Sequence, residues 1–187
     1  MKKIYLIFVL FTFFGCNDDS NLGNDYFYLA DYEAIDIGYA YGNMIYKSEN
    51  ENHFNNIIVY SDIKNLKYDD KYVIVLQEPN KGCIIKRLVD DLTTWNNYYL
   101  ENKRDSMVDI VHNRVSLKRI HNLIDKNKKK LNKIGDSILK NDKYFKKLFQ
   151  NKKNYFIIAK CRNFIWGPLT YDEFNFIKKN ESCDLDF

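Results

Sequence analysis

The sequence predicts an α+β fold: an antiparallel sheet of about five to seven strands, a helical insertion at about residues 117–150, and a short C-terminal helix. Three observations favour this class. Short aromatic and β-branched runs, separated by turn residues, recur along the chain. From Leu117 the spacing of apolar residues becomes that of a helix. Near the C-terminus a helix-capping pattern follows the last apolar run.

The clearest strand signals lie near the C-terminus. Residues 155–159 are a run of aromatic and β-branched side chains, which is typical of a buried strand. Residues 164–166 are expected to return as the second strand of a hairpin. We expect Gly167-Pro168 to end that strand, because proline has no N–H to donate to a strand ladder.

A helix is predicted immediately after this hairpin. Thr170 stands three residues before Glu173, which is the spacing of a capping box. We therefore expect a helix to begin at Thr170 and to pack Phe174 and Ile177 against the sheet.

Further strands are predicted in the first half of the chain. They are expected at residues 26–29, 37–46 with a turn or bulge at Gly42-Asn43, 56–60, 71–77 and, after a turn at 78–82, 83–87. Residues 72–77 resemble residues 155–160, and each run precedes a turn and a second short strand. We interpret them as two hairpins of one antiparallel sheet.

Helices are predicted between these hairpins. Leu117, Ile120, Ile124 and Leu131 share one helical face, and a second helix is expected over residues 136–149. Gly135 is expected to separate the two helices, and Asn141-Asp142 to start a further turn. Residues 88–107 fit either a strand or a helix.

The N-terminus has the features of a lipoprotein signal. Met1-Lys2-Lys3 is basic, and residues 4–14 are an apolar run too short to span a bilayer as a mature helix. The run ends at Gly15-Cys16, which resembles the lipoprotein box in which the cysteine thiol takes a diacylglycerol. Cys16 is therefore the predicted lipid attachment site and, with a palmitate or similar acyl chain, the membrane anchor.

This interpretation divides the chain into three parts. Residues 1–15 are the predicted signal peptide, residues 16–25 a polar tether, and residues 26–187 a single α+β domain. The acidic pair Asp18-Asp19 resembles the signal that sends Bacteroidota lipoproteins to the outer leaflet of the outer membrane. We expect an outer-membrane lipoprotein that faces either the periplasm or the cell surface.

Several motifs resemble a family of small uncharacterised Bacteroidota lipoproteins, a domain of unknown function. They are Asn154-Tyr155 at the start of a strand, Gly167-Pro168-Leu169-Thr170, the following Asp172-Glu173-Phe174, Asn141-Asp142-Lys143-Tyr144-Phe145, and the opening at residues 28–39. The resemblance spans most of the mature chain. It implies a fold and a location, and no activity, because the family has none assigned.

The cysteines other than Cys16 have no metal-binding spacing. In an oxidising compartment, Cys83 and Cys161 are the predicted disulfide, with Cys183 as a buried thiol. The alternative is that all three are buried small hydrophobic side chains.

Positive charge is concentrated in one segment. Residues 118–153 hold 13 Lys/Arg and three Asp, a net charge of +10, whereas the whole chain is +4. The remainder therefore has a net charge of −6, or −8 once Lys2 and Lys3 leave with the signal peptide.

Two interpretations of the lysines at 118–153 remain open. One is that they only form solvated helix faces. The other is a patch for an anionic lipid or glycan, predicted at Lys128, Lys129, Lys130 and Lys133. No nucleic-acid partner is expected, because aromatic residues are sparse in the segment and a tethered, secreted chain seldom meets nucleic acid.

No catalytic, cofactor-binding or metal-binding motif is found, and no cofactor is predicted. His112 and His121 lie nine positions apart, so they do not share adjacent helical turns. The sequence therefore favours a membrane-anchored, non-enzymatic binding or structural lipoprotein. The alternatives are an immunity or inhibitor lipoprotein that blocks a toxin or hydrolase, and an enzyme whose catalytic residues form no local motif.

Overall fold

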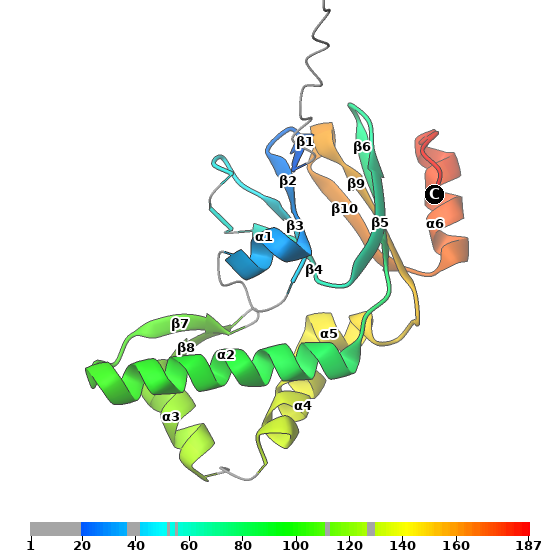
Figure 1. Ribbon diagram of the computed structural model, residues 1–187. Coiled ribbons are helices and arrows are strands. Elements are labelled where there is room, and N and C mark those ends of the chain that lie inside the picture. The colour runs from blue at the N-terminus through cyan, green and yellow to red at the C-terminus, as the bar shows by residue number, and fades with distance from the viewer. Residues whose placement is uncertain (1–19, 37–41, 52, 55, 111–112, 127–129) are drawn as a thin grey trace, which may run out of the picture.

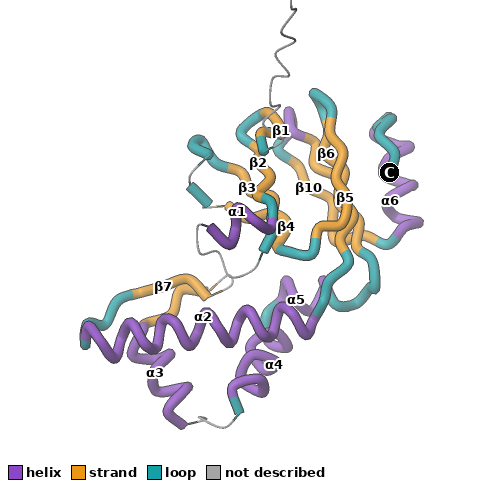
Figure 2. Tube along the Cα trace, viewed as in Figure 1, coloured by secondary structure: helices purple, strands orange, loops and turns teal. Residues whose placement is uncertain are grey.

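The computed structural model describes residues 20–36, 42–51, 53–54, 56–110, 113–126 and 130–187. It shows an α+β fold with a short C-terminal helix, as predicted (Figure 1). Most strands gather in one half of the molecule and most helices in the other (Figure 2). The strands form two four-stranded antiparallel sheets and a separate hairpin, instead of one sheet.

The first sheet has the order β1-β2-β3-β4. Its strands are β1 (Asn21–Gly23), β2 (Tyr26–Leu29), β3 (Met44–Lys47) and β4 (Asn56–Tyr60), and helix α1 (Asp31–Asp36) follows β2. The second sheet has the order β10-β9-β6-β5. Its strands are β5 (Ile63–Tyr68), β6 (Tyr72–Gln77), β9 (Asn154–Ala159) and β10 (Phe164–Leu169), with the 3-10 helix η1 (Lys160–Arg162) between the last two.

The helical half lies between β6 and β9 in the sequence. It consists of α2 (Lys81–Asn102), the hairpin β7 (Met107–Ile110) and β8 (Asn113–Ser116), α3 (Leu117–Lys126), α4 (Leu131–Asn141) and α5 (Lys143–Leu148). Helix α6 (Tyr171–Glu181) is the last described element and packs against the second sheet (Figure 1).

The two sheets pack on each other through alternate side chains. Val73 and Val75 of β6 join Ile45 and Val59 of the first sheet in one buried cluster. Ile74, between the two valines, points to the opposite face, where it packs with Phe174 of α6. Because both faces of β6 are covered, the strand is a continuous apolar run.

Two hairpins do share one sheet, as predicted. Strands β6 and β9 pair antiparallel in the centre, with Val75 opposite Phe156. The partner of β6 within its own hairpin is β5, which precedes it, and not residues 83–87.

Residues 83–87, predicted as a strand, lie in the first turns of α2. Asn80 caps this helix, because its side chain accepts a hydrogen bond from the Cys83 N–H at 3.1 Å. Ile84, Leu88 and Leu92 then recur every four residues and are buried along one stripe. The short apolar run at 83–87 is therefore part of this longer helical pattern, which also makes residues 88–102 helical.

Gly135 does not separate two helices, contrary to the prediction. It is buried within α4, and a Cβ atom at this position would lie 3.2 Å from Cγ2 of Ile85 in α2. Its role is to let the two helices approach closely. The predicted turn at Asp142 is confirmed, since the carboxylate caps α5 by accepting hydrogen bonds from the N–H groups of Tyr144 and Phe145.

The predicted tether at residues 16–25 is partly wrong. Residues 21–23 form β1, and the Leu22 side chain is only 1% exposed. The Lys160 ammonium also donates a hydrogen bond to the Leu22 carbonyl at 2.5 Å. Burial of the Leu22 side chain therefore makes residues 21–23 part of the first sheet. Cys16 lies outside the described residues, and none of the described helices is both long and apolar enough to cross a bilayer.

The predicted Cys83–Cys161 disulfide is wrong. Both residues are exposed free thiols, and Cys183 is a buried free thiol. Cys83 follows the end of β6 at Gln77, whereas Cys161 follows the end of β9, which pairs with the start of β6 at Tyr72. The two cysteines therefore lie at opposite ends of one strand pair, too far apart for a disulfide.

Strand β10 does not end at Gly167-Pro168 but runs on to Leu169. The register with β9 shifts between Trp166 and Leu169. Because β10 is at the edge of the sheet, an irregularity and a proline are tolerated there without breaking a central ladder.

The capping box at the start of α6 is confirmed and gives a stability prediction. The Thr170 hydroxyl accepts from the Glu173 N–H at 3.3 Å, and the Glu173 carboxylate accepts from the Thr170 N–H at 2.8 Å. We expect Thr170→Ala to lower the free energy of unfolding by about 1 kcal/mol, because a helix-end N–H loses its partner.

The urea midpoint at constant denaturant slope measures this effect. Thr94→Ala is the matched control, since the Thr94 hydroxyl bonds the Asp90 carbonyl inside α2 and caps nothing. Equal midpoints for Thr170→Ala and the wild type would show that the box does not hold the helix start.

Candidate functional site

A groove of about 990 Å³ opens in the helical half of the molecule. It lies among the β7–β8 hairpin, α3, α4 and the start of α5, the elements at the bottom of Figure 1. Its volume is at the upper end of the range of small-molecule sites. We therefore take this groove as the candidate site.

Helix α3 supplies one wall of the groove. Leu117, Ile120 and Ile124 belong to the buried core of the helical half. Leu123 stands beside that face, is 36% exposed and lines the groove. Arg119 and Lys126 lie four positions before it and three after it, so the three side chains share one helical stripe along the groove.

Helix α4 supplies the opposite wall with Ser137, Ile138 and Asn141. A second hollow of about 290 Å³ lies next to the groove and is also lined by Leu123, Ser137 and Ile138. Since the two hollows share these residues, the groove extends along α3 and α4 to the open end where the two helices approach their connection.

Lys130 and Lys133 line this second hollow. They are two of the four lysines predicted as an anion patch. The other two, Lys128 and Lys129, lie outside the described residues. The structure thus brings the described half of the predicted patch to the end of the groove.

The charged residues in the lining of the main groove are predominantly basic. They include Arg114, Arg119, Lys126 and Lys143, against a single carboxylate, Asp142. That carboxylate is already engaged, because one of its oxygens accepts hydrogen bonds from two N–H groups at the start of α5, at 2.9 and 3.1 Å. The groove therefore retains a positive potential that favours an anionic ligand.

Part of the basic segment is neutralised elsewhere. Asp136 pairs with both Lys140 and Lys81 at 2.6 Å, and these hydrogen bonds, the one from Lys140 foremost, lower the pKa of the Asp136 carboxyl. Lys153 pairs with Glu78 at 3.0 Å. These lysines agree with the first interpretation, in which the basic residues only form the solvated faces of the helices, and their ion pairs link neighbouring elements.

The cations along α3 and α4 differ in this respect. Among the described residues, Arg119, Lys126, Lys130 and Lys133 have no carboxylate within 4.0 Å. Arg114 has a long contact of 3.9 Å with Asp109 at the surface. Part of the uncompensated charge of this segment thus lies beside the groove.

Tyr144 closes the inner end of the groove. Its hydroxyl accepts a hydrogen bond from the Tyr60 N–H at 3.1 Å, which joins the helical half to strand β4. Burial raises the pKa of the Tyr144 hydroxyl to about 12, so it is neutral at physiological pH. This residue shapes the groove and does not supply a charge.

Other polar groups do not form a catalytic set with the groove. The His121 ring nitrogen lies 2.9 Å from the Asn96 side-chain oxygen, and the ring packs beside Tyr99, away from the lining. His112 lies outside the described residues. In the part of the chain that the structure describes, no cluster of three or more His, Cys, Asp or Glu side chains is placed to hold a metal ion. What the groove provides is apolar surface with positive charge at its rim.

Sequence reasoning missed Arg114, Arg119 and Lys126 as site residues. A signal for two of them was present, because Arg119, Leu123 and Lys126 have the spacing of one helical stripe. The contribution of Arg114 could not be inferred, since the β7–β8 hairpin that carries it was not predicted.

Comparisons with protein-family models, with curated proteins and with solved structures found no match to this chain.

The contact between Tyr144 and Tyr60 gives a stability prediction. We expect Tyr144→Phe to lower the free energy of unfolding by about 1–3 kcal/mol, because the Tyr60 N–H would be left without its acceptor. Chemical denaturation measures the loss. Tyr98→Phe, at a residue that is 45% exposed on α2, is the control and should stay within about 0.5 kcal/mol of the wild type. Equal effects of the two substitutions would contradict the proposed contact.

Proposed function

We propose that the protein is a membrane-anchored, non-enzymatic lipoprotein that binds a partly apolar, anionic ligand in the groove between α3 and α4. The observation that carries this proposal is the combination of an apolar wall, at Leu123 and Ile138, with uncompensated cations at the rim. Neither feature alone would distinguish a binding site from an ordinary solvated surface.

The arrangement of the fold supports a tethered binding module. Strand β1, where the described chain begins, lies at the top of Figure 1, and the elements of the groove lie at the bottom. Cys16 precedes Ser20 by four residues, so an extended tether spans at most about 14 Å. A lipid on Cys16 would hold the β1 end near the membrane and leave the groove facing away from it.

This orientation decides where the ligand comes from. In this proposed orientation the two sheets lie between the anchored β1 end and the groove elements, so the ligand would approach from the aqueous side or from a facing surface. We place the protein at the outer membrane, facing the periplasm or the cell surface, because Asp18-Asp19 follows the anchor.

The anchor gives the first test. We expect wild-type cells to incorporate a clickable palmitate into the protein, and Cys16→Ser to abolish the label. Cys161→Ser is the control, because Cys161 is an exposed thiol that lipoprotein processing would leave untouched. Label that persists in Cys16→Ser, or that is absent from the wild type, would overturn the assignment of the anchor.

The groove gives the second test. Residues 16–187 with Cys16→Ser retain every described element and lack the proposed lipid anchor. We expect this protein to enhance the fluorescence of the anionic apolar dye ANS, and the dye affinity to fall at least tenfold in Leu123→Glu, which places a negative charge in the groove.

Leu100→Glu is the matched control. Leu100 is 40% exposed on α2, close to the exposure of Leu123, but does not line the groove. Unfolding curves establish that both variants are folded. Equal dye binding by both variants and the wild type would rule out the groove as the ligand site.

A further inference from the structure

The groove is asymmetric in charge along its length. At the base, near β7 and β8, Arg114 faces Asp109 and Lys143 adjoins Asp142, so negative groups accompany the cations. At the open end, Lys130 and Lys133 line the second hollow, whose lining includes no carboxylate. At the end where α3 finishes and α4 begins, no carboxylate of the lining offsets the lysines.

Lys126 adds to the charge at this open end. It is the last residue of α3 and lines the main groove, so it stands beside the hollow that holds Lys130 and Lys133. The nearest acidic residue in sequence is Asp125, which lines neither hollow. Lys126, Lys130 and Lys133 thus lie on adjoining parts of the groove lining, and an anionic group placed at this end would be attracted by all three.

The apolar surface runs inward from the same position. Leu123 of α3 and the half-buried Ile138 of α4 line both hollows, and Val115 of β8 continues the apolar lining towards the base. One partly exposed apolar side chain from each helix thus borders a strip suited to a single chain. A bound apolar chain would remove these side chains from water, which is favourable.

We propose that the ligand is a single-chain anionic amphiphile, with its apolar chain between α3 and α4 and its head group at Lys126, Lys130 and Lys133. This inference rests on the proposed function of the groove and adds the chemical class and the direction of the ligand. Burial of the chain would supply affinity, and the three cations would select the sign of the head group.

Isothermal titration calorimetry with residues 16–187 carrying Cys16→Ser tests the class of ligand. Four probes are compared below their micellar concentrations: dodecanoate, dodecylphosphocholine, dodecyltrimethylammonium and inorganic phosphate. We expect one dodecanoate to bind per chain, at least tenfold more tightly than the zwitterionic and cationic probes. Phosphate alone should bind far more weakly than dodecanoate, because it lacks the chain.

A charge-matched pair of variants tests the direction. Lys126→Gln/Lys130→Gln/Lys133→Gln should weaken dodecanoate binding at least tenfold at low salt and leave dodecylphosphocholine unchanged. Lys146→Gln/Lys147→Gln/Lys152→Gln removes the same charge from exposed positions that line neither hollow, and should have little effect. The difference between the two triple variants should shrink at high salt, because exposed charges are screened over about 8–10 Å near physiological ionic strength.

The outcomes separate this inference from the proposed function. Equal binding of the three chain-bearing probes, abolished by Leu123→Glu, would retain the groove as the site and overturn the head-group assignment. Equal weakening by the two triple variants would overturn it as well. Phosphate binding as tight as that of dodecanoate would overturn the role of the chain. If no amphiphile binds and Leu123→Glu changes nothing, both the inference and the proposed function are wrong.

Discussion

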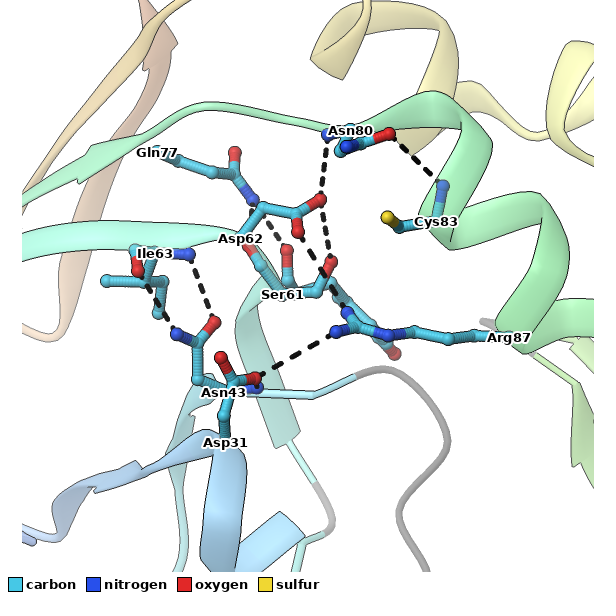
Figure 3. A network of polar contacts seen from close by, with 10 residues as sticks. Asp31, Asn43, Ser61, Asp62, Ile63, Gln77, Asn80, Cys83 and Arg87 are labelled. Atoms are coloured by element: carbon cyan, nitrogen blue, oxygen red, sulfur yellow. Dashed lines mark hydrogen bonds and ion pairs between the residues drawn. The ribbon is translucent and has the colours of Figure 1, made fainter. Parts of the chain in front are cut away.

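The corner at Ser61-Asp62 is the constraint on which the rest of the structure depends. Both residues adopt positive φ angles, 43° and 56°, and the chain turns there from β4 in the first sheet to β5 in the second. Side chains from other elements hold this conformation (Figure 3): Gln77 donates to the Ser61 carbonyl at 2.8 Å, and Asn43 exchanges two hydrogen bonds with the Ile63 backbone. A left-handed backbone that costs energy locally is thus compensated by buried polar contacts.

The same corner positions the helical half. The Asp62 carboxylate accepts a hydrogen bond from the Asn80 N–H at 2.8 Å, next to the start of α2, and lies 3.9 Å from the Arg87 guanidinium about two turns further on. Glycine at position 42 leaves space for the Arg87 side chain beside Asp62, since a Cβ at this position would lie 2.7 Å from the Arg87 guanidinium. Helix α2 is therefore fixed at its first turns, and it carries α4 through the close approach at Gly135.

The groove follows from how α3 and α4 pack. Both helices turn most of their apolar side chains to α2 and the core of the helical half, so their remaining stripes lie along the groove. Ion pairs such as Lys140 with Asp136 neutralise basic residues on the side towards α2, where they hold the helices together. Arg119, Lys126, Lys130 and Lys133, beside the groove, have no such partners among the described residues. The same lysine-rich segment can therefore link helices by ion pairs and also attract an anion.

The sequence by itself determined the α+β class, the strands with unbroken aromatic or β-branched runs, and the cap at Thr170, because these features depend on neighbours in the chain. The helical spacing of Ile84, Leu88 and Leu92 was also present in the sequence, although residues 83–87 were assigned to a strand. Only the tertiary structure decided that Gly135 serves a helix contact and that Cys83 and Cys161 are far apart. The site divides in the same way: the excess of lysine was visible in the sequence. The groove was not, since it requires the β7–β8 hairpin, α3 and α4 to come together, with Arg114 at one end and Lys133 at the other. Contacts between residues distant in the chain depend on how whole elements pack, and a local pattern carries no record of that packing.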